Sequence, residues 1–178
     1  MPQPKKIVIT GPESTGKSTL CEQLATNFNT NWVPEYAREY LMKLARPYTY
    51  DDLLIIAKGQ LDQEDRITAS LKSTLVFIDT DMYVMKVWCE FVFGKCHSFI
   101  LDEIVKRKYD VYLLCNTDLP WVADELREYP DLESRERLYY MYKDHMINQT
   151  TPWIDIKGDY EQRLSNAISF INVANMEM

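Results

Sequence analysis

The sequence contains few of the residues that build metal centres, disulfide frameworks and flexible joints. Its 178 residues include only two histidines, five glycines and four cysteines, which are Cys21, Cys89, Cys96 and Cys115. The cysteines are irregularly spaced, without a Cys-x-x-Cys pair, whereas zinc sites and disulfide frameworks need regular ligand spacings. The sequence therefore indicates neither kind of site, and so few glycines leave little scope for a flexible linker between domains.

Long apolar runs and a basic surface are also absent. No stretch approaches the roughly 20 apolar residues of a membrane-spanning helix, and the first strand-like run begins too early for a signal peptide to precede it. The formal net charge is −7, whereas nucleic-acid binding requires clustered Lys and Arg. The single basic cluster, residues 106–108, lies at the end of a predicted helix, where cations favour the helix dipole. We therefore expect a cytoplasmic protein with no membrane or nucleic-acid partner.

Short apolar runs alternate with longer segments of helical period along the chain. The runs are residues 7–10, 32–33, 75–78, 111–115 and 153–156. Strands that are apolar throughout are buried on both faces of a parallel sheet, so helices must cover both sides. The sequence thus predicts a single α/β domain over residues 1–178, with three layers and a central parallel sheet of about five strands. A long helix is predicted at residues 50–71, and the charge-rich residues 118–148 are predicted to form a helical lid between the fourth and fifth strands.

A phosphate-binding pattern follows the first apolar run directly. Residues 11–18 read Gly-Pro-Glu-Ser-Thr-Gly-Lys-Ser and match G-x-x-x-x-G-K-[ST]. In such a loop, backbone N–H groups surround the phosphates, the lysine reaches the β- and γ-phosphates, and the serine hydroxyl binds magnesium. The pattern therefore predicts a P-loop NTPase fold in which Lys17 is catalytic and Ser18 binds Mg²⁺. The predicted ATP-binding residues of the loop are Gly11, Glu13, Ser14, Thr15, Gly16, Lys17, Ser18 and Thr19.

A carboxylate ends the third apolar run, which continues as Ile78-Asp79-Thr80-Asp81. An acid at the carboxyl end of this strand lies beside the phosphate loop and its magnesium ion. Asp79 is therefore predicted to be catalytic and to bind Mg²⁺ through a coordinated water molecule. Asp81 is a candidate for substrate binding, although an Asp at the start of the following helix is also typical of an N-cap.

The second apolar run is followed by residues 34–40, which read Pro-Glu-Tyr-Ala-Arg-Glu-Tyr. Glu35 lies at the carboxyl end of the strand, and Arg38 follows about one helical turn later on the same face. A carboxylate there can accept the proton of an attacking hydroxyl group, and the arginine can steady that carboxylate or the moving phosphoryl group. We predict that both bind substrate and that Glu35 is catalytic. The alternative is an exposed ion pair at the start of a helix.

Three further candidates follow the fourth and fifth apolar runs. Trp121 lies at the mouth of the predicted sheet, where a flat heterocycle can stack on it, although packing is the commoner role of such a ring. Arg127, in the predicted lid, is expected to stabilise charge on the transferred phosphoryl group. Tyr160 occupies the position where kinases of this architecture often pack adenine. Residues 116–118 read Asn-Thr-Asp and lack the Asn-Lys-x-Asp signature of guanine binding, so a signalling GTPase is disfavoured.

Together, several blocks of the sequence resemble the ribosylnicotinamide kinase domain of the NadR-like NAD-salvage proteins. The resemblance spans nearly the whole chain, and its blocks are residues 11–19, 33–40, 77–81, 121–127 and 158–163. It implies a fold similar to the nucleoside monophosphate kinases and ATP-dependent phosphorylation of the 5′-hydroxyl of nicotinamide riboside. By position, Glu35 and Asp81 are implied to face the riboside, Trp121 to stack on the nicotinamide and Arg127 to close over the phosphates. The resemblance leaves open which of Glu35, Asp79 and Asp81 is the base.

The sequence departs from this family in two ways. Full-length members carry a nucleotidyltransferase domain, and often a DNA-binding domain, before the kinase; here the chain opens on the first kinase strand, so adenylyl transfer and repression are not expected. The family reads Asp-Asp-Gly where this sequence has Ala123-Asp124-Glu125, although Asp124 stays a predicted substrate-binding residue. The second departure concerns the identity of the acceptor more than the chemistry of phosphoryl transfer.

Two alternatives to nicotinamide riboside kinase stay open at this point. One is a kinase for another nucleoside or small metabolite, and the other is a regulatory P-loop ATPase that switches a protein partner. Glu35 together with Trp121 favours a kinase, since a pure switch needs no second pocket for a flat base. The oligomeric state is not readable from the sequence.

Overall fold

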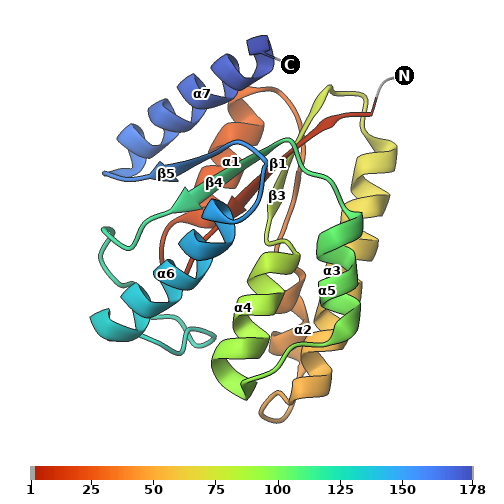
Figure 1. Cartoon of the computed structure of the whole chain (residues 1–178), viewed down its shortest axis with the longest axis vertical. Coiled ribbons are helices and arrows are strands. Elements are labelled where there is room, and N and C mark those ends of the chain that lie inside the picture. The colour runs from red at the N-terminus through yellow and green to blue at the C-terminus, as the bar shows by residue number, and fades with distance from the viewer. Residues whose placement is uncertain (1–2, 178) are drawn as a thin grey trace.

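Five parallel strands form the central sheet in the order β2-β3-β1-β4-β5. Figure 1 shows β3, β1, β4 and β5 side by side. They are β1 (Lys5–Thr10), β2 (Trp32–Val33), β3 (Leu75–Asp79), β4 (Val111–Cys115) and β5 (Trp153–Ile156). The structure is a computed structural model and describes residues 3–177. Neighbouring parallel strands must be joined by crossovers, and helices supply them. The predicted parallel sheet is confirmed, with its strands in the predicted places.

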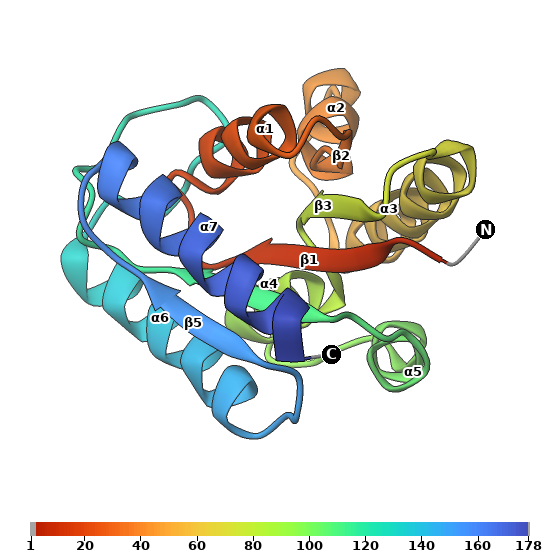
Figure 2. The same ribbon diagram turned by 90° about the horizontal axis from the view of Figure 1, so that it is seen from above.

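Helices cover both faces of the sheet, as Figure 2 shows. One face packs against α1 (Lys17–Asn27) and α7 (Tyr160–Glu177), and the other packs against α4 (Met82–Phe93) and α6 (Leu132–Ile147). Alternate residues of one strand serve the two layers: Ile7 and Ile9 face α1 and α7, whereas Val8 faces α4 and α6. Burial on both faces explains why these strands are apolar throughout.

A second group of helices packs beside the β2 and β3 side of the sheet. They are α2 (Tyr36–Lys43), α3 (Tyr50–Ser70) and α5 (Ser98–Lys106), which meet α4 in a separate apolar cluster. The predicted helix at residues 50–71 is confirmed as α3, and it begins with a capping box. The Thr49 side chain and backbone N–H both pair with the Asp52 carboxylate, at 2.7 Å each.

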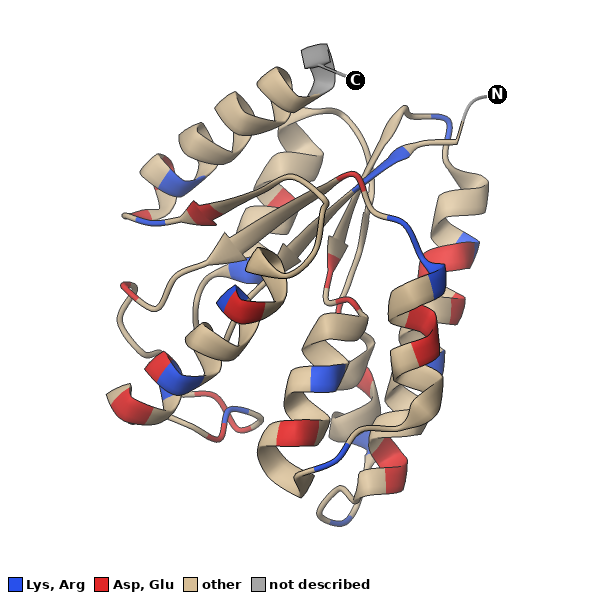
Figure 3. Cartoon of the chain, viewed as in Figure 1, with Lys and Arg blue, Asp and Glu red and all other residues tan. Residues whose placement is uncertain are grey.

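The basic cluster at residues 106–108 lies at the C-terminus of α5, as predicted. Arg107 donates hydrogen bonds to both carboxylate oxygens of Asp65 on α3, at 2.7 and 2.8 Å, and to Glu103 at 3.1 Å. Figure 3 shows this basic segment beside acidic residues of α3. Arg107, the central residue of the cluster, thus forms ion pairs with Asp65 and Glu103 of the same chain. Within residues 3–177, no helix combines the length and the apolar character needed to cross a lipid bilayer.

The predicted lid, residues 118–148, consists of two different parts. Helix α6 begins at Leu132 after an N-cap, in which the Asp131 carboxylate accepts a hydrogen bond from Ser134 N at 2.8 Å. The buried apolar side chains of α6 pack on the sheet and are Leu138, Tyr139, Tyr142 and Met146. Residues 116–131, which we call the β4–α6 loop, contain no helix and extend over the ends of the strands. Because α6 belongs to the layer that covers the sheet, lid closure stays a prediction for the loop alone.

Candidate active site

The phosphate loop turns between β1 and α1 through backbone conformations that favour glycine. Gly11 has φ of 133° and Gly16 has φ of 78°. A Cβ atom on Gly11 would lie 2.7 Å from the backbone oxygen of Cys115, so this close approach to β4 also requires glycine. Lys17 Nζ and Thr15 Oγ1 both donate hydrogen bonds to Pro12 O, at 2.7 and 2.8 Å. The loop thus leads directly into the N-terminus of α1, where backbone N–H groups without helical partners favour an anion.

Asp79 is the last residue of β3 and lies beside the phosphate loop. Ser18 Oγ donates a hydrogen bond to Asp79 Oδ2 at 2.5 Å, while Asp79 Oδ1 is buried and has no hydrogen-bond partner among the described residues. The pKa of Asp79 is raised to about 6, because burial disfavours the charged form and the negative charge of Glu35 adds to that effect. Lys17 and Ser18 act in the opposite direction. A serine hydroxyl beside a carboxylate with a spare oxygen is a donor set that suits Mg²⁺ bound to phosphates.

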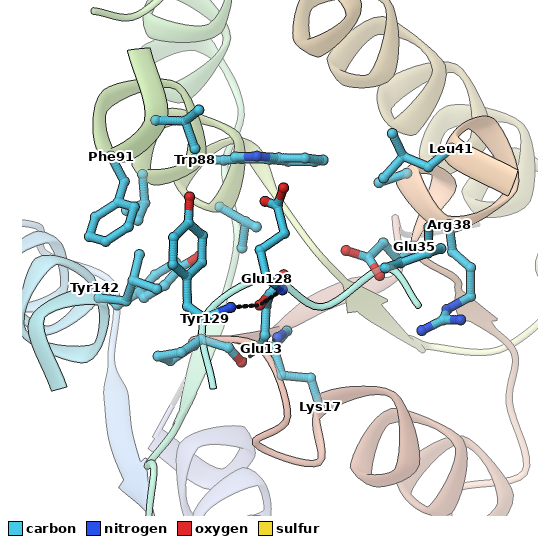
Figure 4. A pocket seen from close by; sticks show the side chains of 18 residues that line it. Glu13, Lys17, Glu35, Arg38, Leu41, Trp88, Phe91, Glu128, Tyr129 and Tyr142 are labelled. Atoms are coloured by element: carbon cyan, nitrogen blue, oxygen red, sulfur yellow. Dashed lines mark hydrogen bonds between the residues drawn. The ribbon is translucent and has the colours of Figure 1, made fainter. Parts of the chain in front are cut away.

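Two adjoining pockets open beside the phosphate loop. The first, which we call the loop pocket, is lined by Glu13, Ser14, Thr15, Gly16, Lys17, Ser18, Thr19, Glu35, Arg38, Val122, Arg127 and Tyr160. The second, which we call the aromatic pocket, lies between α2, α4, α6 and the β4–α6 loop (Figure 4). Both pockets share the side chains of Glu13, Lys17, Glu35 and Arg38. A group that moves from a ligand in one pocket to a ligand in the other would therefore pass these side chains.

The wall of the aromatic pocket is mainly apolar. Its side chains include Leu41, Val84, Val87, Trp88, Phe91, Val92, Leu126, Tyr129, Leu138 and Tyr142. In Figure 4, Phe91, Tyr129 and Tyr142 lie on the side opposite Glu35 and Arg38. Phe91 and Tyr129 meet edge to face, with ring centroids 4.9 Å apart. One side of the pocket is thus suited to a flat ring, and the other side presents charged groups.

The β4–α6 loop is tied to the phosphate loop by two side chains. Glu13 Oε2 accepts hydrogen bonds from Glu128 N at 3.0 Å and from Tyr129 N at 3.4 Å, and Ser14 Oγ accepts one from Val122 N at 2.8 Å. Burial raises the pKa of Glu13, although these backbone hydrogen bonds favour its charged form. The phosphate loop, which lines both pockets, therefore also positions the β4–α6 loop.

Most of the predicted site residues come together here. Arg127 lines the loop pocket and donates a hydrogen bond to Val122 O at 2.5 Å. Arg38 pairs with Asp124 at 3.0 Å, which joins α2 to the β4–α6 loop. Tyr160 lies at the edge of the loop pocket, where a Cβ atom on Gly16 would be 3.3 Å from its ring. Glu35 lies at the N-cap position of α2 and faces both pockets.

Trp121 lies in the β4–α6 loop, and its predicted stacking on a flat ring stays a prediction. Trp121 is not among the residues that line either pocket, and the guanidinium of Arg135 lies 5.6 Å from the centre of its ring. Arg135 is itself buried and donates a hydrogen bond to Leu119 O at 3.0 Å, so this contact is part of the loop's packing. The tryptophan of the aromatic pocket is Trp88. This place in the pocket was not predictable, because Trp88 lies in a helix whose apolar pattern indicates only core packing.

Asp81 was predicted either to bind substrate or to cap the following helix, and the structure shows the cap. Its side chain is 1% exposed and caps α4 by accepting hydrogen bonds from Tyr83 N at 3.1 Å and Val84 N at 3.3 Å. The hydroxyl of Tyr112 donates a further hydrogen bond at 2.9 Å. Burial raises the pKa of Asp81 to about 7, although these hydrogen bonds favour the carboxylate. Asp81 lines neither pocket, so the N-cap alternative describes it better than contact with a substrate.

Replacing Asp81 with alanine is expected to lower the free energy of unfolding by about 2 to 4 kcal/mol, because the cap is lost and the buried Tyr112 hydroxyl loses its acceptor. Urea denaturation measures this loss. The control is Asp51→Ala, which removes an exposed acid from the first turn of α3 and should cost less than about 1 kcal/mol. If the Asp81→Ala variant has normal stability but binds substrate more weakly, Asp81 acts in substrate binding rather than as a cap.

Sequence reasoning missed the structural importance of Arg163, which is 2% exposed. Its guanidinium donates hydrogen bonds to Thr15 O at 2.9 Å, Gly158 O at 2.7 Å and Asn116 O at 3.1 Å, and it pairs with the Asp118 carboxylate. Arg163 thus joins the phosphate loop, the end of β4 and the turn before α7. The spacing Gly-Asp-Tyr-x-x-Arg was the available signal, but nothing in the sequence marks this arginine as buried.

The curated relatives of this chain are larger proteins. The trifunctional NAD biosynthesis/regulator protein NadR of Salmonella typhimurium is 28% identical over 172 residues, which cover 94% of this chain and 42% of the relative. NadR of Escherichia coli is 28% identical over 175 residues, with the same coverage of 94% and 42%. The chain therefore spans less than half the length of these curated relatives.

Solved structures share the fold. A NadR protein in complex with NR aligns with a TM-score of 0.81 and 24% identity, over 97% of this chain and 50% of that one. A NadR protein in complex with NAD and AMP-PNP aligns with a TM-score of 0.72 and 23% identity, over 97% and 49%. Thymidylate kinase from Candida albicans aligns with a TM-score of 0.70 and 15% identity, over 97% and 93%. The chain thus shares its three-layer fold with these proteins, one of which is a thymidylate kinase. The family model AAA_28, described as an AAA domain, matches residues 6–163, and the chain belongs to this family.

Proposed function

We propose that this chain is an ATP-dependent kinase that phosphorylates nicotinamide riboside to nicotinamide mononucleotide in NAD salvage. The observation that carries the proposal is the pair of adjoining pockets that share Glu13, Lys17, Glu35 and Arg38. A kinase needs a nucleotide and an acceptor on either side of one transfer point, whereas a regulatory ATPase needs only the nucleotide pocket. The NadR relatives, and the NadR structures with NR and with AMP-PNP, support the same reading.

The loop pocket is the proposed ATP site. Lys17 would neutralise the β- and γ-phosphates, and Arg127 would stabilise charge on the phosphoryl group during transfer. Tyr160, at the edge of this pocket, would pack against the adenine. Ser18 and Asp79 fit a bound Mg²⁺, since their oxygen atoms lie together beside the loop. When bound, that ion neutralises phosphate charge.

Glu35 is the proposed general base. Asp79 lies in a hydrogen bond with Ser18 at 2.5 Å, and Asp81 caps α4, so both carboxylates are already committed to other roles. Glu35 faces the aromatic pocket and the loop pocket together, which is where an acceptor hydroxyl must lie for in-line transfer. Arg38 lies beside it, and its ion pair with Asp124 holds the β4–α6 loop near the acceptor.

The charges of the aromatic pocket favour a nucleoside over a nucleotide as acceptor. A nucleoside monophosphate needs cations around its own phosphate. The cations that line this pocket are Lys17 and Arg38, and both lie at the junction with the loop pocket. The two departures from the family pattern, Ala123 and Glu125, are exposed and are not among the residues that line the pocket. They therefore leave the proposed acceptor site unchanged.

The acceptor preference is tested with purified protein, ATP and Mg²⁺, by offering nicotinamide riboside and the common nucleosides one at a time. We expect kcat/KM for nicotinamide riboside to exceed that of any common nucleoside by at least about tenfold, because the NadR relatives and the NadR structure with NR point to this acceptor. Direct separation of phosphorylated products gives each rate. If another nucleoside has a higher kcat/KM, the assignment as a kinase stands and the proposed acceptor is wrong.

A further inference from the structure

We propose that Glu128 is a specificity-determining residue, which makes the aromatic pocket prefer an acceptor ring that carries a positive charge. This inference rests on the proposed function, because it concerns the pocket in which the acceptor ring would bind. Glu128 lies in the β4–α6 loop and lines the aromatic pocket. Figure 4 shows its side chain extending toward the indole of Trp88.

The carboxylate of Glu128 is held in place by a short chain of hydrogen bonds. The hydroxyl of Tyr48 donates to Glu128 Oε2 at 2.7 Å, and the same hydroxyl accepts a hydrogen bond from Trp88 Nε1 at 3.1 Å. The rings of Tyr48 and Trp88 meet edge to face, with centroids 5.2 Å apart. Tyr48 therefore fixes both the indole and the carboxylate, so the ring face and the negative charge are presented together.

The backbone at this position is fixed as well. Glu128 N donates to the carboxylate of Glu13 at 3.0 Å, so the residue is anchored to the phosphate loop at one end and to Tyr48 at the other. A charged side chain that is positioned from both ends loses less conformational freedom when a ligand binds. The position of Glu128 is therefore set before the acceptor arrives.

Among the described residues that line the pocket, neither cation forms an ion pair with Glu128. Arg38 pairs with Asp124 at 3.0 Å, and Lys17 contacts Pro12 O within the phosphate loop. Among the described residues, no Lys, Arg or His forms an ion pair with Glu128. An aromatic wall beside an unpaired carboxylate attracts a flat cation through both the ring face and the negative charge. A pyridinium nucleoside has that chemistry, whereas an uncharged nucleoside does not.

The test compares two acceptors that differ mainly in ring charge, namely nicotinamide riboside and its reduced, uncharged dihydro form. Glu128→Gln keeps the length of the side chain and an oxygen for Tyr48, but removes the charge. We expect this variant to raise KM for nicotinamide riboside about five- to tenfold while changing KM for the dihydro form less than about twofold. KM for ATP should stay unchanged, and thermal unfolding should match the unsubstituted protein.

The control is Glu125→Gln, which removes the same charge from the same loop. Glu125 is exposed, as Glu128 is, but it lies outside both pockets. It should leave the ratio of the two acceptors unchanged. If Glu128→Gln changes KM for both acceptors equally, or for neither, Glu128 does not select charge and this inference is wrong while the kinase assignment stands. If the unsubstituted protein phosphorylates neither pyridine nucleoside, the proposed function fails and the inference fails with it.

Discussion

Lys17→Ala is expected to lower kcat/KM for phosphoryl transfer by at least about 10³-fold while the fold stays intact. Lys17 is the lysine of the phosphate loop, and its side chain lines both the loop pocket and the aromatic pocket. Its ammonium group lies over the loop, 2.7 Å from Pro12 O. No backbone group can replace a positive charge at the point where the phosphoryl group would cross from ATP to the acceptor.

The measurement is the steady-state rate of product formation, with circular dichroism as the check on folding. Lys43→Ala is the matched control, because Lys43 is exposed and pairs with Glu39 on the surface of α2, at 2.5 Å. That control should keep its rate within about twofold of the unsubstituted protein, since surface ion pairs contribute little. If the Lys17→Ala protein turns over at a nearly normal rate, the assignment of the phosphate loop to the reaction is wrong.

Glu35→Gln is expected to reduce kcat by about 10²- to 10⁴-fold, with KM for ATP changed less than about twofold. The amide keeps the shape of the side chain but cannot accept the proton of the acceptor hydroxyl. Glu35 is positioned by the end of β2 and the start of α2, and its charge contributes to the raised pKa of Asp79. The two carboxylates therefore lie near one transfer point but differ in their partners.

Glu39→Gln provides the comparison for this variant. Glu39 lies one turn further along α2 and its side chain is 61% exposed, so the loss of its charge should leave kcat unchanged. If Glu35→Gln keeps full kcat but weakens acceptor binding, Glu35 holds the acceptor without taking its proton. The base must then be sought among other groups at the junction of the two pockets.

The sheet and the phosphate loop were predictable because local sequence determines them. Strands buried on both faces must be apolar throughout, and residues 75–78 and 111–115 show that pattern without interruption. The loop needs glycine at φ values of 133° and 78°, and these are Gly11 and Gly16 of the pattern. The predicted positions of Glu35 and Asp79 followed from the rule that ligands bind at the carboxyl ends of parallel strands.

The wall of the aromatic pocket was not predictable, because it depends on contacts between distant segments. Trp88 belongs to α4, and its orientation is set by Tyr48, which lies 40 residues earlier in the sequence. Trp121 lies against Arg135, a contact that its position in the sequence did not indicate. The charge of residues 118–148 concealed the buried face of α6, so the predicted lid was longer than the β4–α6 loop.

Transfer of a phosphoryl group from ATP to a nucleoside yields two products, and measuring both in one reaction tests the proposed function. ADP and nicotinamide mononucleotide should form in equal amounts when nicotinamide riboside is present. Without the acceptor, ADP formation should be slower by at least about 10²-fold, because transfer depends on a hydroxyl group held at the junction of the two pockets. ADP formation at the same rate with or without acceptor, and without phosphorylated product, would contradict the kinase and favour the regulatory ATPase.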